Sequence, residues 1–164
     1  MTPEHFIVIG GTTGSGRVLV RELYDAGHKV TVLGRHCPAE ADGRSDLHVA
    51  LLDLNDTAAV QRAIASAVAR HGPPHHLVFY QRYRGTSDPW IGELSVTLTA
   101  TKTVIESCIP HFSAGRNQAI VAIGSAADRF VLSEQPVGYH AAKAALLQMI
   151  RYYAVVLGPR TVRA

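Results

Sequence analysis

The fold is decided by the stretch Gly10-Gly11-Thr12-Thr13-Gly14-Ser15-Gly16, which follows the apolar run of residues 6–9 and precedes a helical run over residues 17–26. Glycines in a turn between a strand and a helix reach unusual dihedrals and let backbone N–H groups approach a phosphate. The positive end of the following helix then faces the anion. This loop therefore predicts a site for the pyrophosphate of a dinucleotide.

Outward from this loop, short β-branched runs alternate with longer helical periodicities, a pattern typical of stacked βαβ units. We predict strands over residues 6–9, 29–33, 47–51, 76–80 and 119–123, and helices over residues 14–26, 57–70, 91–112 and 139–157. Residues 158–160 predict a turn into a further strand that begins at Thr161. The expected fold is α/β: a Rossmann-like, doubly wound parallel sheet in three αβα layers, formed by residues 1–164 as a single domain.

Composition and charge exclude several classes of protein. With 47% hydrophobic residues, 18% charged residues and a net charge of +3, the chain predicts one globular domain without a nucleic-acid-binding patch. It contains neither a run of about 20 apolar residues nor a signal-peptide profile, so we expect no membrane partner and a cytoplasmic location. Cys37, Cys108 and the histidines show no metal-ligand spacing, and we predict no metal site.

Two alternatives for the nucleotide can be compared at named residues. A P-loop needs Lys and then Ser or Thr after its last glycine, and here Arg17 and Val18 follow Gly16, which argues against hydrolysis of ATP or GTP. After the second predicted strand stand Gly34 and Arg35, where an acidic side chain would bind the ribose hydroxyls of NAD. A guanidinium at that position can pair with the 2′-phosphate of NADP. We therefore expect NADP, with NAD as the alternative.

Three side chains later in the chain suggest proton-transfer chemistry. Tyr139 and Lys143 stand four residues apart in the last predicted helix, so they share one face. An ammonium close to a phenol stabilises the phenolate and makes proton exchange feasible near neutral pH. Ser125 follows the fifth predicted strand, at the edge of a parallel sheet where ligands bind.

Taken in order, the glycine loop, Ser125 and the run Tyr139-His140-Ala141-Ala142-Lys143 resemble the short-chain dehydrogenase/reductase family over essentially the whole chain. The resemblance implies hydride transfer between a nicotinamide and a small carbonyl or alcohol substrate. It implies that Tyr139 passes the proton, that Ser125 stabilises the substrate oxygen, and that Lys143 supports Tyr139 and binds the nicotinamide ribose. The expected catalytic residues are Ser125, Tyr139, Lys143 and Thr97; the expected cofactor-binding residues are Gly10, Thr12, Thr13, Gly14, Ser15, Gly16, Arg35, Asp53, Leu54, Tyr80 and Lys143.

The sequence departs from the family pattern at three places. The family's Asn-Ala-Gly run after the fourth strand is replaced by Tyr80-Gln81-Arg82, and the asparagine of its fourth helix by Thr97. Relatives also continue through a substrate-binding region and a seventh strand, so the resemblance predicts a chain truncated after Ala164 with its C-terminal strands missing. Two alternatives remain: a dinucleotide-binding module that acts through partners, and an epimerase or dehydratase using the same Tyr and Lys. Amphipathic fourth and fifth helices predict a homodimer or homotetramer.

Overall fold

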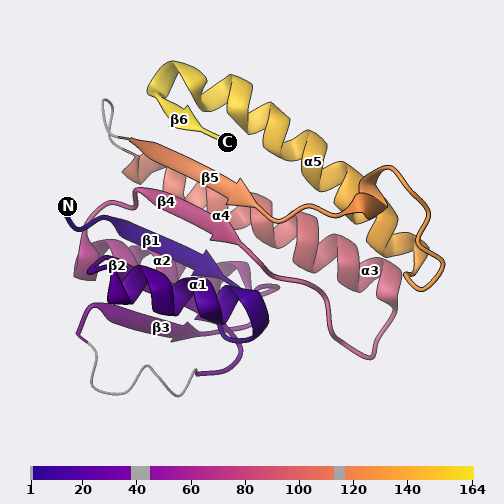
Figure 1. Cartoon of the computed structure of the whole chain (residues 1–164), viewed down its shortest axis with the longest axis horizontal. Coiled ribbons are helices and arrows are strands. Elements are labelled where there is room, and N and C mark those ends of the chain that lie inside the picture. Colours follow the sequence, from indigo (N-terminus) through magenta and orange to yellow (C-terminus); the bar gives the residue numbers. More distant parts are fainter. Residues whose placement is uncertain (1, 38–44, 113–116) are drawn as a thin grey trace.

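Parallel strands form one six-stranded sheet in the order β3-β2-β1-β4-β5-β6 (Figure 1). The computed structural model describes residues 2–37, 45–112 and 117–164. The strands are β1 (His5–Ile9), β2 (Lys29–Gly34), β3 (Leu47–Leu51), β4 (His76–Phe79), β5 (Gln118–Ala122) and β6 (Val162–Arg163). The helices are α1 (Gly14–Asp25), α2 (Thr57–His71), α3 (Pro89–Glu93), the π-helix η2 (Leu94–Thr99), α4 (Ala100–Cys108) and α5 (Val137–Leu157); short 3-10 turns are η3 (Ile109–His111), η4 (Ala126–Asp128) and η5 (Gly158–Arg160).

Each face of the sheet has its own hydrophobic core, because alternate side chains of a strand point to opposite faces. On one face, Val8 and Val32 pack with Val20 of α1. On the other, Ile7 and Leu77 pack with residues of α2, α4 and α5. Figure 1 shows α1 in front of the strands, with α2 and α4 behind them. The predicted three-layer αβα architecture is confirmed.

The strand order reverses between β1 and β4, which lie side by side in the middle of the sheet. Ile9 is in register with Phe79 at the ends of these two strands. The segments that begin at Gly10 and Tyr80 therefore leave neighbouring strands at the same level. Ligands of doubly wound sheets bind at such a reversal point, outside the carboxyl ends of the strands.

The predicted single helix over residues 91–112 is wrong in its bounds and its regularity. It begins earlier, at Pro89, where Asp88 caps the helix by accepting a hydrogen bond from the Trp90 N–H at 2.8 Å. It then widens into η2, continues as α4 to Cys108 and ends in η3, which contains Pro110. The Thr101 hydroxyl donates to the Thr97 carbonyl at 2.7 Å, a side-chain bond to the backbone of the kind that bends helices.

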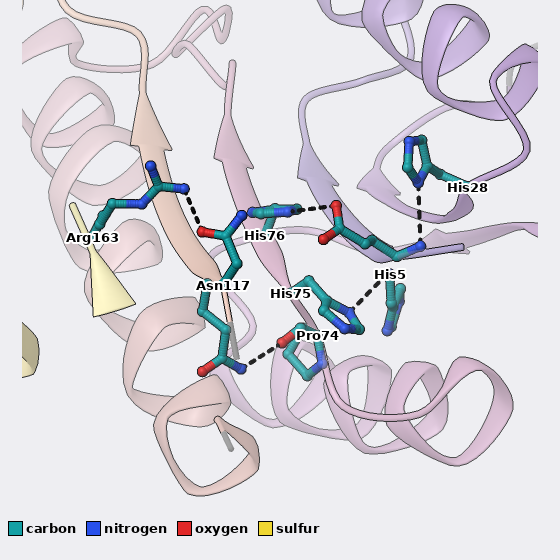
Figure 2. Close-up of polar contacts among 9 residues, drawn as sticks. His5, His28, Pro74, His75, His76, Asn117 and Arg163 are labelled. Atoms are coloured by element: carbon teal, nitrogen blue, oxygen red, sulfur yellow. Dashed lines mark hydrogen bonds and ion pairs between the residues drawn. The ribbon is translucent and has the colours of Figure 1, made fainter. Parts of the chain in front are cut away.

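At the amino-terminal edge of the sheet, histidine rings hold the start of β1 (Figure 2). The His5 N–H donates to Nδ1 of His75 at 3.0 Å, and the Glu4 N–H donates to Nδ1 of His28 at 3.2 Å. The His5 ring is itself buried, with Nδ1 at 2.8 Å from the Gly72 carbonyl and Nε2 at 3.0 Å from the Thr31 hydroxyl. This edge lies opposite the glycine loop and is built from structural hydrogen bonds.

In the part of the chain that the structure describes, no helix combines the length and the apolar character that crossing a membrane requires. No three His, Cys, Asp or Glu side chains of these residues are grouped in a way that could hold a metal ion.

Candidate active site

The glycine loop opens a cavity at the amino-terminal end of α1. Gly14, Ser15 and Gly16 form the first turn of this helix and line the cavity, while Thr13 stands at the capping position. The Thr13 side chain makes no capping hydrogen bond, and the first turn contains no acidic residue. Backbone N–H groups and the positive end of the helix are thus available to an anion.

Glycine is required in this loop because other backbone passes too close for a side chain. Gly10 has φ of +81°, and a Cβ there would lie 2.7 Å from the Gln81 backbone nitrogen. A Cβ at Gly16 would lie 2.6 Å from the Gly10 carbonyl oxygen. The loop is packed against the segment after β4, and the space above it stays open for a ligand.

The cavity has a volume of ≈ 340 Å³, in the range of pockets that bind small molecules and cofactors. It brings together every predicted cofactor-binding residue except Lys143: Gly10, Thr12, Thr13, Gly14, Ser15, Gly16, Arg35, Asp53, Leu54 and Tyr80. Sequence reasoning missed other residues of its lining, among them His36, Asn55, Arg82 and Arg84. The arginines make the lining positively charged, which suits a phosphorylated ligand.

Asp53 lies in this cavity with part of its carboxylate already engaged. Its Oδ1 accepts hydrogen bonds from the Asn55 backbone N–H at 2.9 Å and from Asn55 Nδ2 at 3.1 Å. These bonds shape the turn between β3 and α2 and fix Asp53 at the cavity rim. The segment after β3 thus closes the side of the cavity next to the end of β2.

Tyr139 and Lys143 occupy one buried face of α5, at 9% and 6% exposure. Lys143 Nζ lies 5.8 Å from the centre of the Tyr139 ring. It also donates a hydrogen bond to the Ile123 carbonyl at 2.7 Å, at the end of β5. Two residues further on, Ser125 caps η4, and its Oγ accepts a hydrogen bond from the Ala127 N–H at 3.2 Å. Lys143 therefore ties α5 to the segment that carries Ser125.

Charged neighbours alter the ionisation of Lys143. Burial lowers the pKa of its ammonium, Glu93 opposes that change and Arg82 reinforces it. Burial raises the pKa of Glu93, against the combined effects of Arg82, a hydrogen bond from Thr97 and Lys143. The Thr97 hydroxyl donates to Glu93 Oε2 at 3.4 Å. Thr97, in η2, is 1% exposed, so Thr97, Glu93 and Lys143 are all buried in the interior of the protein.

The side chains of Tyr80-Gln81-Arg82 leave the backbone in different directions. Tyr80 lines the cavity, and its Cβ lies 3.3 Å from where a Cβ on Gly16 would be. Gln81 turns toward the helices, where Nε2 donates to the Thr101 hydroxyl at 2.6 Å. The Arg82 guanidinium lies over the Tyr139 ring, 4.5 Å from its centre, and hydrogen-bonds to Gln135.

A scan against protein-family models matches residues 4–164 to the short chain dehydrogenase family. The chain belongs to this family. Its members are oxidoreductases whose Rossmann-like domain binds a nicotinamide dinucleotide. A search of curated proteins found no match to this chain.

Solved short-chain dehydrogenases have the same fold. A short-chain dehydrogenase/reductase from Burkholderia xenovorans is 26% identical with a TM-score of 0.85, and the match covers 98% of this chain and 71% of that one. A relative from Serratia marcescens is 25% identical with a TM-score of 0.80, covering 97% and 74% of the two chains. A Leptospira borgpetersenii enzyme with bound NAD+ is 16% identical with a TM-score of 0.86, covering 99% and 68%, and it supports the fold alone.

Within this short-chain dehydrogenase, the predicted site residues fall into two groups. The cofactor-binding set gathers around the cavity, whereas Ser125, Tyr139, Lys143 and Thr97 belong to neighbouring elements and do not line it. Arg82 connects the two groups, because it lines the cavity and lies over Tyr139. The replacement of the family's glycine by an arginine was the sequence signal for this contact. Nothing in the sequence indicated that Glu93 would be buried beside it.

Proposed function

We propose that this protein is an NADP(H)-dependent oxidoreductase that transfers a hydride between the nicotinamide and a carbonyl or alcohol substrate. The observation that carries this proposal is the pairing of Tyr139 with Lys143. Both side chains are buried on one face of α5, and Lys143 is bonded to the carboxyl end of β5. That is the edge of the sheet at which the glycine-lined cavity opens.

The protein's own groups have separable roles in this proposal. The bound dinucleotide supplies the hydride acceptor or donor. Tyr139 exchanges a proton with the substrate oxygen, and the Lys143 ammonium stabilises the phenolate form of Tyr139. Ser125 donates a hydrogen bond to that oxygen, which stabilises the charge that develops there. Gly10, Gly14 and Gly16 leave room for the pyrophosphate to reach backbone N–H groups.

Replacing Tyr139 with Phe tests the chemistry. Loss of the hydroxyl should reduce NADPH oxidation with carbonyl substrates by about 100-fold or more, because general acid catalysis contributes about 10²–10⁴-fold. NADPH binding, followed by fluorescence titration, should remain. The control is Tyr152→Phe, which changes a 60% exposed tyrosine on the same helix and should leave turnover unchanged. Full turnover in Tyr139→Phe would contradict the assignment.

Preference for NADP rests on Arg35, which is exposed at the end of β2 and lines the cavity. A charge-assisted hydrogen bond to the 2′-phosphate contributes about 1.5–3 kcal/mol. Arg35→Ala should therefore raise the Kd for NADPH by about 10-fold or more, while the Kd for NADH changes little. Arg21→Ala, at an exposed position of α1, is the control. An equal loss of affinity for both nucleotides would exclude Arg35 as the selective residue.

A second function is favoured by the contact between Arg82 and Tyr139. A guanidinium 4.5 Å from the ring centre occupies space that the family's glycine leaves open. On this alternative the chain binds the dinucleotide without turning it over and acts through partners. Tight NADPH binding with no oxidation across a broad panel of aldehydes and ketones would favour the module over the enzyme.

For the assembly we propose a homodimer or homotetramer in which α4 and α5 pair between subunits. Large apolar side chains support this, since Val155 of α5 is 77% exposed and Tyr152 is 60% exposed. Apolar groups grouped on one helix favour association. Light scattering that showed a monomer across the micromolar range would contradict this assembly.

A further inference from the structure

Glu93, the last residue of α3, is a carboxylate in the interior of the protein. Its side chain belongs to a residue that is only 2% exposed. A buried carboxylate is unfavourable unless cations and hydrogen-bond donors compensate for the lost water. The fold must therefore supply partners for this carboxylate.

The groups that face Glu93 come from three different elements. Thr97 of η2 donates a hydrogen bond to Oε2 at 3.4 Å. Arg82, from the segment after β4, and Lys143, from α5, both act on Glu93 as favourable charges. Both cations act electrostatically on this one carboxylate, and each of them also lies near the Tyr139 ring.

The two cations disturb each other. Arg82 lies 4.5 Å and Lys143 Nζ 5.8 Å from the centre of the same ring. Burial lowers the pKa of Lys143, Glu93 raises it, and Arg82 lowers it further. Arginine keeps its charge at all accessible pH values, so loss of a proton falls on Lys143. If Lys143 deprotonates, its neutral amine can no longer stabilise a negative charge on the Tyr139 oxygen.

We propose that Glu93 is a positioning residue of the active site: its buried carboxylate offsets the positive charge of Arg82, so that Lys143 stays protonated beside Tyr139. The inference deepens the proposed function, on which its catalytic consequence rests. It also accounts for two features of this chain together, an arginine where the family has glycine and a glutamate that is buried and bound by Thr97.

The chain offers a direct measurement, because it contains only three lysines, Lys29, Lys102 and Lys143. Protein labelled with ¹³C at lysine Cε, without any nucleotide, gives three resonances to titrate by NMR. Lys143→Arg identifies the third by its disappearance. In Glu93→Gln the titration midpoint of Lys143 should fall, by about 1 pH unit, because a nearby opposite charge favours the charged form of a lysine.

Arg82→Gln should move the Lys143 midpoint in the opposite direction, upward, and the double variant should lie between the two single variants. Glu22→Gln makes the same chemical change on exposed α1 and should leave Lys143 unaffected. Glu93→Asp keeps the charge and should restore most of the midpoint. A Lys143 midpoint that does not respond to Glu93→Gln, in protein shown to be folded by circular dichroism, overturns the proposal. If Glu93→Gln does not fold, an Arg82→Gln midpoint equal to that of the original chain overturns it.

Turnover provides a second, separate readout. If NADPH oxidation is observed, its alkaline limb should move to lower pH in Glu93→Gln, because Lys143 then loses its proton earlier. The NMR titration does not depend on turnover, so the two proposals fail independently. An inactive chain whose Lys143 midpoint responds as expected would refute the oxidoreductase function and leave the charge balance standing. An active chain whose Lys143 midpoint does not respond to Glu93→Gln would support the oxidoreductase function and refute the role of Glu93.

Discussion

Gly10 and Gly27 have almost the same positive φ, +81° and +82°, and very different surroundings. A Cβ at Gly10 would lie 2.7 Å from the Gln81 nitrogen, whereas one at Gly27 would meet nothing within 4 Å. Alanine at Gly27 should therefore destabilise the fold by only the left-handed backbone term, about 1–2 kcal/mol. Alanine at Gly10 should lower the free energy of unfolding by about 1–3 kcal/mol more, because the backbone of the neighbouring segment must move.

Urea unfolding of the two glycine variants separates conformation from space. Gly10→Ala should also weaken NADPH binding, since the Gln81 segment would shift at the cavity wall, whereas Gly27→Ala should bind the nucleotide normally. Equal losses of stability in both variants would mean that the loop relaxes without strain. The glycine loop would then be less tightly coupled to the segment after β4 than its geometry indicates.

A buried hydroxyl, that of Thr101, links that segment to the helices. Thr101 is fully buried; its oxygen accepts from Gln81 Nε2 at 2.6 Å and it donates to the Thr97 carbonyl at 2.7 Å. Thr101→Val keeps the shape and leaves the Gln81 amide without this partner, which should lower the free energy of unfolding by about 1–3 kcal/mol. Thermal and urea unfolding measure the change.

Thr99→Val is the matched control, because Thr99 is exposed at the end of η2, two residues before Thr101. A double variant, Gln81→Leu with Thr101→Val, removes both polar partners and should be less destabilised than Thr101→Val alone. If the single and double variants unfolded alike, the hydrogen bond between Gln81 and Thr101 would not be holding the segment.

The regular elements were predictable because their signals are local. Short apolar runs rich in β-branched residues placed β1 to β5 to within one residue at each end, and the turn at residues 158–160 indicated the short β6. The widening of the helix at η2 was not predictable. Its apolar spacing fits an ordinary helix. Of the side chains that bond to its carbonyls, Thr101 is local, whereas Gln81 is brought there only by tertiary packing.

The same reason separates the predictable and unpredictable parts of the site. The glycine loop carries its function in consecutive residues, so the sequence predicted this part of the cavity, whereas it missed the polar residues His36, Asn55, Arg82 and Arg84 of the lining. Glu93 gave no signal, because one glutamate near the start of an amphipathic helix is usually solvated. Its burial depends on α3 packing against α5, where a Cβ on Gly138 would lie 2.9 Å from the Trp90 Cα. Arg82 was visible as an anomaly, but the direction of its side chain was not.

At the scale of the whole molecule, the two ends of the parallel strands have different roles. Residues at the carboxyl ends of the strands form the cavity, and the amino ends are held by histidines (Figure 2). A change in the histidine edge should therefore alter stability without altering nucleotide affinity. His5 is the clearest case, because it is 1% exposed and links β1 to the Gly72 carbonyl and to Thr31 of β2.

His5 predicts how stability depends on pH. Burial is the main cause that lowers its pKa from 6.5 to about 4, and a hydrogen bond to the Gly72 carbonyl only partly opposes this. Because the folded-state pKa is below the unfolded one, the unfolded chain binds the proton more readily. The stabilising contribution is complete above pH 6.5 and is lost as pH falls through about 4. Between pH 7 and pH 5 the loss should be about 2 kcal/mol.

His5→Gln should reduce stability at pH 7, because a buried ring with two hydrogen bonds is replaced. The free energy of unfolding should also change less between pH 7 and pH 5, because the titrating group is gone. Urea unfolding at the two pH values gives both quantities. His36→Gln, which changes an exposed histidine, should keep the slope of the original chain. An equally steep curve in His5→Gln would place the acid-sensitive group elsewhere. The Kd for NADPH at pH 7 should be unchanged in His5→Gln, because no atom of His5 lines the cavity.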